Sequence, residues 1–202
     1  MTMAQSAISN QQSKIVGKVW KYGDGVNTDV IFPGKYTYTL KEPQEIAAHA
    51  LEDLDARFAV DAQPGDVIVA GRNWGNGSSR EQAVTALKYK GIAAVVAKSF
   101  ARIYFRNGIN QGLLLITCPE AVDAAQPGDT IEVDVERNVV RLFTNAGPPP
   151  STTLHSAQDV REFPFPPLSS TALGIINAGG LVAHIRKKLG LTNTEAVPLG
   201  GE

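Results

Sequence analysis

A glycine-rich run that leads directly into a helical pattern constrains this chain more than any other feature. Three glycines lie within Gly71–Gly77, and Ser78, Ser79, Arg80 and Glu81 follow at once. The Ser78-x-x-Glu81 spacing is that of a capping box, so we expect a helix to begin here, with free N–H groups facing the opening that the glycines leave. Anions bind well at such a helix start, and a guanidinium is suited to holding a carboxylate. The run therefore predicts a carboxylate-binding helix start that carries two hydroxyls.

Two simpler interpretations of this run are a phosphate-binding loop and a plain helix cap. The run lacks the lysine that a Walker-type loop places after its last glycine, and it does not match G-x-G-x-x-G. Capping alone is what most serines at such positions do. The presence of Arg80 beside two hydroxyls at a glycine-lined opening favours a binding site over a cap.

Composition narrows the classes of protein to which the chain can belong. Its 202 residues are 43% hydrophobic and carry a formal net charge of −1, so we expect one domain with a real core and no basic surface for nucleic acid or membrane. The single cysteine, Cys118, excludes an internal disulfide and cannot alone hold a metal centre; it is predicted to be a small core residue. Residues 1–13 are polar without an apolar targeting segment, which predicts a tail on a cytoplasmic protein.

Strand-like and helix-like patterns alternate along the chain, which is typical of the α/β class. Residues 14–190 are predicted to form one domain, with an irregular proline-rich segment at 144–167, C-terminal helices at 169–189 and a tail at 191–202. The expected strands are 15–22, 67–70, 92–97, 113–117, 130–135 and 139–143, the last two as a hairpin, and the other expected helices are 43–54, 79–89 and 100–107.

Other polar clusters are open to both structural and functional interpretations. The run Asn27-Thr28-Asp29 is either a turn bonded to its own backbone or part of a site. Residues 36–40 are either an edge strand or a loop with aromatic wall residues. Arg102 and Arg106, four residues apart, form a basic stripe that is expected to be solvated. The three histidines show no metal-ligand spacing, so no metal site is predicted.

Four motifs, in order along most of the chain, resemble the small subunits of the isopropylmalate isomerases in the aconitase superfamily. They are residues 26–33, 71–81, 97–107 and 176–181. The resemblance implies the swivelling β/β/α domain of that superfamily, here with a C-terminal helical appendage. It also implies a separate large subunit carrying three cysteines and a [4Fe–4S] cluster, so that no cofactor is bound by this chain. The implied reaction, in leucine biosynthesis, is dehydration of 2-isopropylmalate to an alkene diacid followed by rehydration to 3-isopropylmalate.

The same resemblance implies roles for individual residues. The expected catalytic residues are Ser78, as the base, and Asp29, which with Thr28 positions the base or a proton-carrying water. The expected substrate-binding residues are Ser79, Arg80, Thr28 and Tyr38. Homoaconitase-like relatives carry an arginine at the position of Tyr38, where it binds an extra carboxylate. An uncharged aromatic residue favours an alkyl group instead, because burying a carboxylate without a cation is costly.

Some alternatives and departures remain at the level of sequence. The main interpretation expects a large-subunit partner and a small dicarboxylate substrate. The other functions considered are a dehydratase of the dimethylmalate, citraconate or homoaconitate type and a non-catalytic domain that binds a dicarboxylate. The chain has Gln82 where the family usually has histidine, and Trp74 where it usually has phenylalanine.

Overall fold

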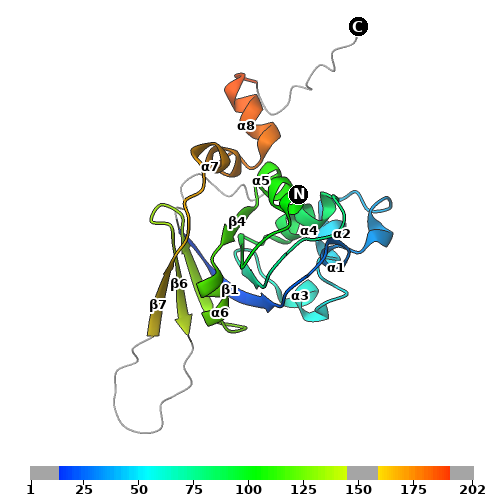
Figure 1. The fold of residues 1–202 in the computed structure, drawn as a ribbon. Coiled ribbons are helices and arrows are strands. Elements are labelled where there is room, and N and C mark those ends of the chain that lie inside the picture. The colour runs from blue at the N-terminus through cyan, green and yellow to red at the C-terminus, as the bar shows by residue number, and fades with distance from the viewer. Residues whose placement is uncertain (1–13, 145–158, 192–202) are drawn as a thin grey trace, which may run out of the picture.

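A single seven-stranded mixed sheet organises the molecule (Figure 1). The computed structural model describes residues 14–144 and 159–191. The strands lie in the order β4-β3-β2-β1-β5-β6-β7, parallel from β4 to β1 and antiparallel from β1 to β7. Their bounds are β1 Lys14–Tyr22, β2 Val67–Ala70, β3 Ala94–Ala97, β4 Leu114–Thr117, β5 Thr130–Asp134, β6 Val139–Thr144 and β7 Asp159–Pro164. The α/β class and the predicted 130–143 hairpin are confirmed.

Helices and short turns of helix fill the connections between the strands. In Figure 1, α1, α2 and α4 gather on one side, the β6–β7 ribbon extends on the other, and α7 and α8 lie beyond α5. The bounds are α1 Thr28–Ile31, the 3-10 turn η1 Gly34–Tyr36, α2 Pro43–Ala48, α3 Ala56–Asp61, α4 Gln82–Lys90, α5 Arg102–Gln111, α6 Pro119–Ala124, α7 Ser170–Asn177 and α8 Leu181–Lys188. Among the described residues, no helix has the length and apolar character that a membrane crossing requires.

Both faces of the central parallel strands are buried, which explains why their sequences are continuous apolar runs. Alternate side chains of β2 enter two separate cores, with Ile68 in the core beneath α2, α3 and α4 and Val69 in the core beneath α6. Val95 and Val96 of β3 divide between the same two cores. This division fixes β2 and β3 in the middle of the molecule, and the loops that follow them meet at one edge of the sheet.

Two Pro-Gly-Asp turns hold the point at which the sheet changes from parallel to antiparallel. The carboxylate of Asp66 accepts hydrogen bonds from the Lys18 backbone N–H at 3.2 Å and from the Trp20 indole at 2.8 Å. In the second turn, the Gly128 N–H donates to the Val19 carbonyl at 2.9 Å. The two turns therefore bind adjacent residues of β1, although their sequence likeness is too short to indicate a repeat.

Several predicted boundaries are wrong for local reasons. The helix expected over 43–54 ends at Ala48, and the chain turns at Leu51, whose φ is 55°. The helix expected to close at Gly108 continues to Gln111, because Gly108 lies inside it: a Cβ there would be 2.3 Å from Leu115. Part of the segment expected to be irregular forms β7, which pairs with β6. The predicted tails, 1–13 and nearly all of 191–202, lie outside the described residues.

The C-terminal helices are joined to the body of the protein at Gly179–Gly180. The Lys88 ammonium of α4 donates to the carbonyls of Gln111, at 2.5 Å, and Gly179, at 2.8 Å. A Cβ on Gly180 would be 2.9 Å from the Asn110 carbonyl oxygen, so only glycine fits at this junction. The last sequence motif, 176–181, is thus accounted for by packing against the end of α5.

Cys118 provides a test of the core. Its side chain is fully buried, its Sγ lies 3.7 Å from the Pro164 carbonyl oxygen, and burial raises the pKa of the thiol. Since the thiolate is the reactive form, we expect a thiol reagent at neutral pH to label the native chain at least about tenfold more slowly than the urea-unfolded chain. Labelling of the native chain at the unfolded rate would contradict the described packing.

Candidate active site

The loop between β2 and α4 packs against α5 at Gly75 and against α1 at Gly77. Gly75 has a φ of 76°, and a Cβ there would be 2.1 Å from the Tyr104 ring. Gly77 has a φ of 99°, and a Cβ there would be 3.3 Å from the Thr28 hydroxyl oxygen. Both positions combine a left-handed backbone with close packing, so glycine is required at each. The glycines of the run therefore bring the Ser78 segment against residues 27–29.

Backbone pairing and one side-chain bond join Thr28 to the serine segment. The Thr28 N–H donates to the Asn76 carbonyl at 2.8 Å, and the Ser78 N–H donates to the Thr28 hydroxyl at 2.9 Å. Thr28 is 1% exposed, so its hydroxyl is a fixed acceptor. The Asn27 side chain caps α1 by accepting from the Val30 N–H at 2.9 Å. The turn interpretation thus holds for Asn27, whereas Thr28 reaches across the chain to the predicted base.

An ion pair joins the next residue, Asp29, to Arg80. The Arg80 Nη2 donates to Asp29 Oδ1, and Arg80 Nη1 lies 3.4 Å from the Thr37 hydroxyl oxygen. The Arg80 side chain is 23% exposed and that of Asp29 is 58% exposed, so the guanidinium is the more enclosed partner. Gly34 leaves room for the pair, because a Cβ there would be 2.5 Å from Arg80 Nη1. The structure therefore brings four of the predicted site residues together: Thr28, Asp29, Ser78 and Arg80.

The predicted capping box is wrong. Helix α4 begins at Gln82, and Glu81, its N-cap residue, makes no side-chain cap. The Glu81 carboxylate instead accepts from the Gln111 side chain at 3.2 Å, and the Ser78 N–H is already bonded to Thr28. Because the effect of a helix dipole is confined to its first turn, it contributes less at Ser78 than the sequence pattern indicates. Among the predicted site residues, Arg80 is the one that carries a positive charge.

Tyr38 is not in contact with the rest of the predicted site. Its side chain is 91% exposed, at the tip of the loop that follows η1. The base of this loop is fixed, because the Tyr36 ring stacks on His49 with centroids 4.0 Å apart and Lys35 pairs with Glu52 at 3.3 Å. Burial favours a higher pKa for the Glu52 carboxyl, but hydrogen bonds from His49 and Lys35 outweigh it and lower that pKa. The loop thus holds Thr37 against Arg80 and presents Tyr38 outward.

Sequence reasoning missed the positioning contacts around the predicted residues. Thr37 lies against Arg80, and the Asn107 side-chain amide donates to the Ser79 carbonyl at 3.0 Å. Asn107 belongs to a motif that the resemblance had identified without a role. Gly34 carries no signal of its own, because only the structure shows that a Cβ there would require the Arg80 guanidinium to shift.

The two residues that depart from the family pattern, Trp74 and Gln82, lie in different surroundings. Trp74 is fully buried, stacked on Tyr22 at 6.2 Å and edge-on to Tyr104 at 6.5 Å between ring centroids. It therefore belongs to the core and not to the surface of the loop. Gln82 is the first residue of α4 and is partly buried.

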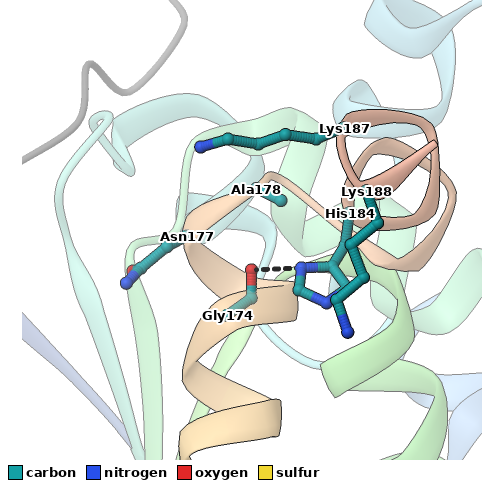
Figure 2. A pocket seen from close by; sticks show the side chains of 6 residues that line it. All are labelled: Gly174, Asn177, Ala178, His184, Lys187 and Lys188. Atoms are coloured by element: carbon teal, nitrogen blue, oxygen red, sulfur yellow. Dashed lines mark hydrogen bonds between the residues drawn. The ribbon is translucent and has the colours of Figure 1, made fainter. Parts of the chain in front are cut away.

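Two hollows are lined by residues other than the predicted site residues. The first, about 510 Å³, lies between α7 and α8 (Figure 2), where His184 Nδ1 is 3.0 Å from the Gly174 carbonyl oxygen. The second, about 460 Å³, lies at the start of α5 and includes Arg102 and Arg106. Within residues 14–144 and 159–191, no three His, Cys, Asp or Glu side chains are grouped as metal ligands. The candidate site combines the hydroxyl-bearing residues Thr28 and Ser78 with the Arg80–Asp29 ion pair, and its guanidinium is suited to a carboxylate.

Comparison with known proteins identifies relatives over nearly the whole chain. Residues 12–121 match the model of the aconitase C-terminal domain family. The chain is 45% identical to the 3-isopropylmalate dehydratase small subunit of Aquifex aeolicus, an alignment that covers 88% of this chain and 98% of the relative. It is 43% identical to the protein of the same name from Thermodesulfovibrio yellowstonii, covering 88% and 97%.

A solved structure agrees with these sequence relatives. The crystal structure of a 3-isopropylmalate dehydratase from Methanocaldococcus jannaschii superimposes with a TM-score of 0.74 at 39% identity, covering 87% of this chain and 95% of that one. The resemblance stated from the motifs is confirmed, and so is the expected superfamily fold.

Proposed function

The chain belongs to the family of 3-isopropylmalate dehydratase small subunits, and from this premise we propose that Ser78 and Arg80 are its contribution to a shared active site. As a hydro-lyase of this family it acts in isomerising 2-isopropylmalate to 3-isopropylmalate through an alkene diacid. One observation carries the assignment of residues: the adjacent residues Thr28 and Asp29 hold Ser78 and Arg80 at the same open loop. These contacts support the proposal that a base and a carboxylate-binding group share one loop.

Ser78 is the proposed base that removes the carbon-bound proton next to a substrate carboxylate. A serine hydroxyl is a weak acid, so its alkoxide needs nearby positive charge and exclusion of water. Arg80 supplies the charge, and the hydrogen bond from the Ser78 N–H to buried Thr28 fixes the backbone. In the second half of the reaction the protonated serine returns the proton to the neighbouring carbon, while hydroxide adds to the first. Thr28 is therefore proposed as a positioning residue for the base.

Arg80 is the proposed ligand of a substrate carboxylate, and Asp29 positions it. A guanidinium donates two parallel hydrogen bonds to a carboxylate, which fixes both its distance and its plane. Asp29 occupies one donor, Nη2, and the exposure of Asp29 leaves the pair open to an incoming anion. Ser79, which is exposed beside Arg80, is proposed to donate a further hydrogen bond to the same substrate.

The [4Fe–4S] cluster is proposed to belong to the large subunit. The described residues of this chain do not fit such a group: Cys118 is buried with its Sγ against Pro164, and no described set of ligands is gathered elsewhere. The name of the relatives, a small subunit, implies a large-subunit partner. When bound there, the cluster would supply a Lewis acid for the leaving hydroxyl.

Tyr38 is proposed to form the wall that faces the alkyl group of the substrate. Its ring is exposed in this chain and lies one residue from Thr37, which contacts Arg80. Burying an alkyl substituent against an aromatic ring desolvates no polar group. Burying a third carboxylate there without a cation would carry a large desolvation cost. No observation favours a triacid substrate or a non-catalytic dicarboxylate-binding domain.

A substrate panel tests this function. The full chain is mixed anaerobically with the large subunit from the same organism, and turnover of 2-isopropylmalate, dimethylmalate, citraconate and homoaconitate is compared. We expect 2-isopropylmalate to have the highest kcat/KM, with homoaconitate at least about 100-fold lower, since a buried unpaired polar group typically costs about 2–3 kcal/mol.

Each subunit alone serves as the control and is expected to be inactive. Preference for homoaconitate would contradict the assignment of Tyr38. Absence of turnover on every member of the panel, with an intact complex, would contradict the proposed function.

A further inference from the structure

The hollow at the start of α5 has the composition of a protein interface. It measures about 460 Å³ and lies where β3 leads into α5, with one wall from the end of β4. Its lining residues are Ser99, Phe100, Arg102, Phe105, Arg106 and Thr117. The rings of Phe100 and Phe105 are 5.6 Å apart and form an apolar base, and beside them Ile103 is 50% exposed. Aromatic side chains and arginine are the residues enriched in interfaces between proteins. We call this the arginine hollow.

Among the described residues, the two arginines of the hollow have no carboxylate partner. Arg102 and Arg106 lie one turn apart on the exposed side of α5. Within the part of the chain that the structure describes, neither guanidinium lies within 4.0 Å of a carboxylate, although nearby Lys98 pairs with Asp123. Two like charges at this spacing destabilise an isolated helix slightly. No described carboxylate neutralises the pair, so its positive charge is available to a partner protein.

Direct contacts connect the arginine hollow to the proposed active-site loop. The Asn73 N–H donates to the Ser99 hydroxyl at 2.9 Å, and Trp74 forms a backbone bridge with Phe100. Further along α5, the Asn107 amide donates to the Ser79 carbonyl at 3.0 Å. Because the proposed reaction is shared between two chains, the large subunit must approach this loop closely. The hollow lies beside that approach.

The apolar stripe of α8 is the main rival surface. Val182, Ile185 and Leu189 are exposed along it, and the hollow of Figure 2 lies at its side, with Lys187 and Lys188. The described contacts tie this region to the far end of α5, near Gln111, and not to the Ser78 loop. Nothing described indicates what covers it, so the stripe supports no assignment of its own.

We propose that the arginine hollow is a docking site for an acidic segment of the large subunit. The segment would bring one carboxylate to each guanidinium and place an apolar side chain on the base formed by Phe100 and Phe105. Arginine is suited to this role because it binds carboxylates with two parallel hydrogen bonds and is weakly hydrated. The inference rests on the proposed function, since it is the shared reaction that brings the partner to this face.

A charge-reversal variant tests the docking site. The double variant Arg102→Glu/Arg106→Glu of the full chain is titrated with the purified large subunit at about 0.15 M ionic strength, and Kd is measured by calorimetry. We expect Kd to rise at least about 30-fold, because two favourable charge pairs become repulsive. The neutral variant Arg102→Gln/Arg106→Gln is expected to raise Kd by a smaller factor. At saturating large subunit, KM for 2-isopropylmalate is expected to stay at the wild-type value.

Arg137→Glu is the matched control, because Arg137 is an exposed arginine on the turn between β5 and β6. Its Kd is expected to remain within about threefold of wild type. The proposal is overturned if the double variants bind as wild type, if Arg137→Glu weakens binding equally, or if KM rises while Kd does not. Circular dichroism shows whether the charge-reversal variant is folded. If it is not, the Kd of Arg102→Gln/Arg106→Gln tests the proposal in its place. A complex that depends on both arginines but turns over no isopropylmalate would refute the proposed function and leave the docking site standing.

Discussion

Replacing Ser78 by alanine is expected to lower kcat of the reconstituted pair by about 10³-fold, the middle of the range for loss of a general base. The substitution removes the hydroxyl but keeps the backbone N–H that bonds to Thr28, so the loop is expected to keep its position. The measurement is steady-state turnover of 2-isopropylmalate with saturating large subunit, together with Kd for the partner. We expect Kd to be unchanged, since the exposed surface around the loop is not altered.

Ser79→Ala is the matched control for this prediction, because it removes a neighbouring hydroxyl that is exposed. It is expected to raise KM by less than about tenfold, the loss of one hydrogen bond, with kcat close to wild type. Full activity of Ser78→Ala would make the proposed base wrong while leaving membership of the family intact.

Replacing Arg80 by lysine is expected to cost about 1.5 to 3 kcal/mol of transition-state binding, the worth of a hydrogen bond to a charged group. That corresponds to a fall in kcat/KM of roughly 10- to 150-fold. Lysine keeps the positive charge but loses the planar fork, so it cannot contact Asp29, Thr37 and a substrate carboxylate together. We expect most of the loss to appear as a higher KM, measured with the reconstituted pair.

Arg72→Lys is the control for Arg80, because Arg72 is exposed in the same loop and its backbone N–H, not its side chain, bonds to Asp24. It is expected to behave as wild type. A normal KM in Arg80→Lys would show that this guanidinium does not hold the substrate.

The sequence predicted those parts of the fold whose patterns are set by burial or by local turns. The apolar runs of β2 and β3 identified strands, because both of their faces are enclosed. Glycine at the end of α4 marked its last turn correctly, with a φ of 90° at Gly91. Boundaries set by distant contacts were not predictable. The early end of α2 depends on the turn at Leu51, whose N–H bonds to the Ile31 carbonyl.

In the candidate site, too, the sequence predicted the residues but not the contacts between distant segments. Sequence motifs identified Ser78, Arg80 and the Thr28-Asp29 pair, and the structure brings them together. The motifs did not reveal which partner each residue has. The sequence pattern linked Ser78 to Glu81, whereas the structure links it to Thr28. Asp29 pairs with Arg80, a partner that no sequence pattern indicated. Such contacts join residues about 50 positions apart and carry no local signal.

The most direct test of the shared-site account is the rate of the chemical step itself. Rapid mixing of 2-isopropylmalate with a preformed complex, followed by ultraviolet detection of the alkene diacid, measures proton removal in a single turnover. Complexes containing Ser78→Ala are expected to form the alkene about 10³-fold more slowly than wild type, at equal occupancy of partner and substrate. Alkene formation at the wild-type rate in that complex would contradict the shared-site account.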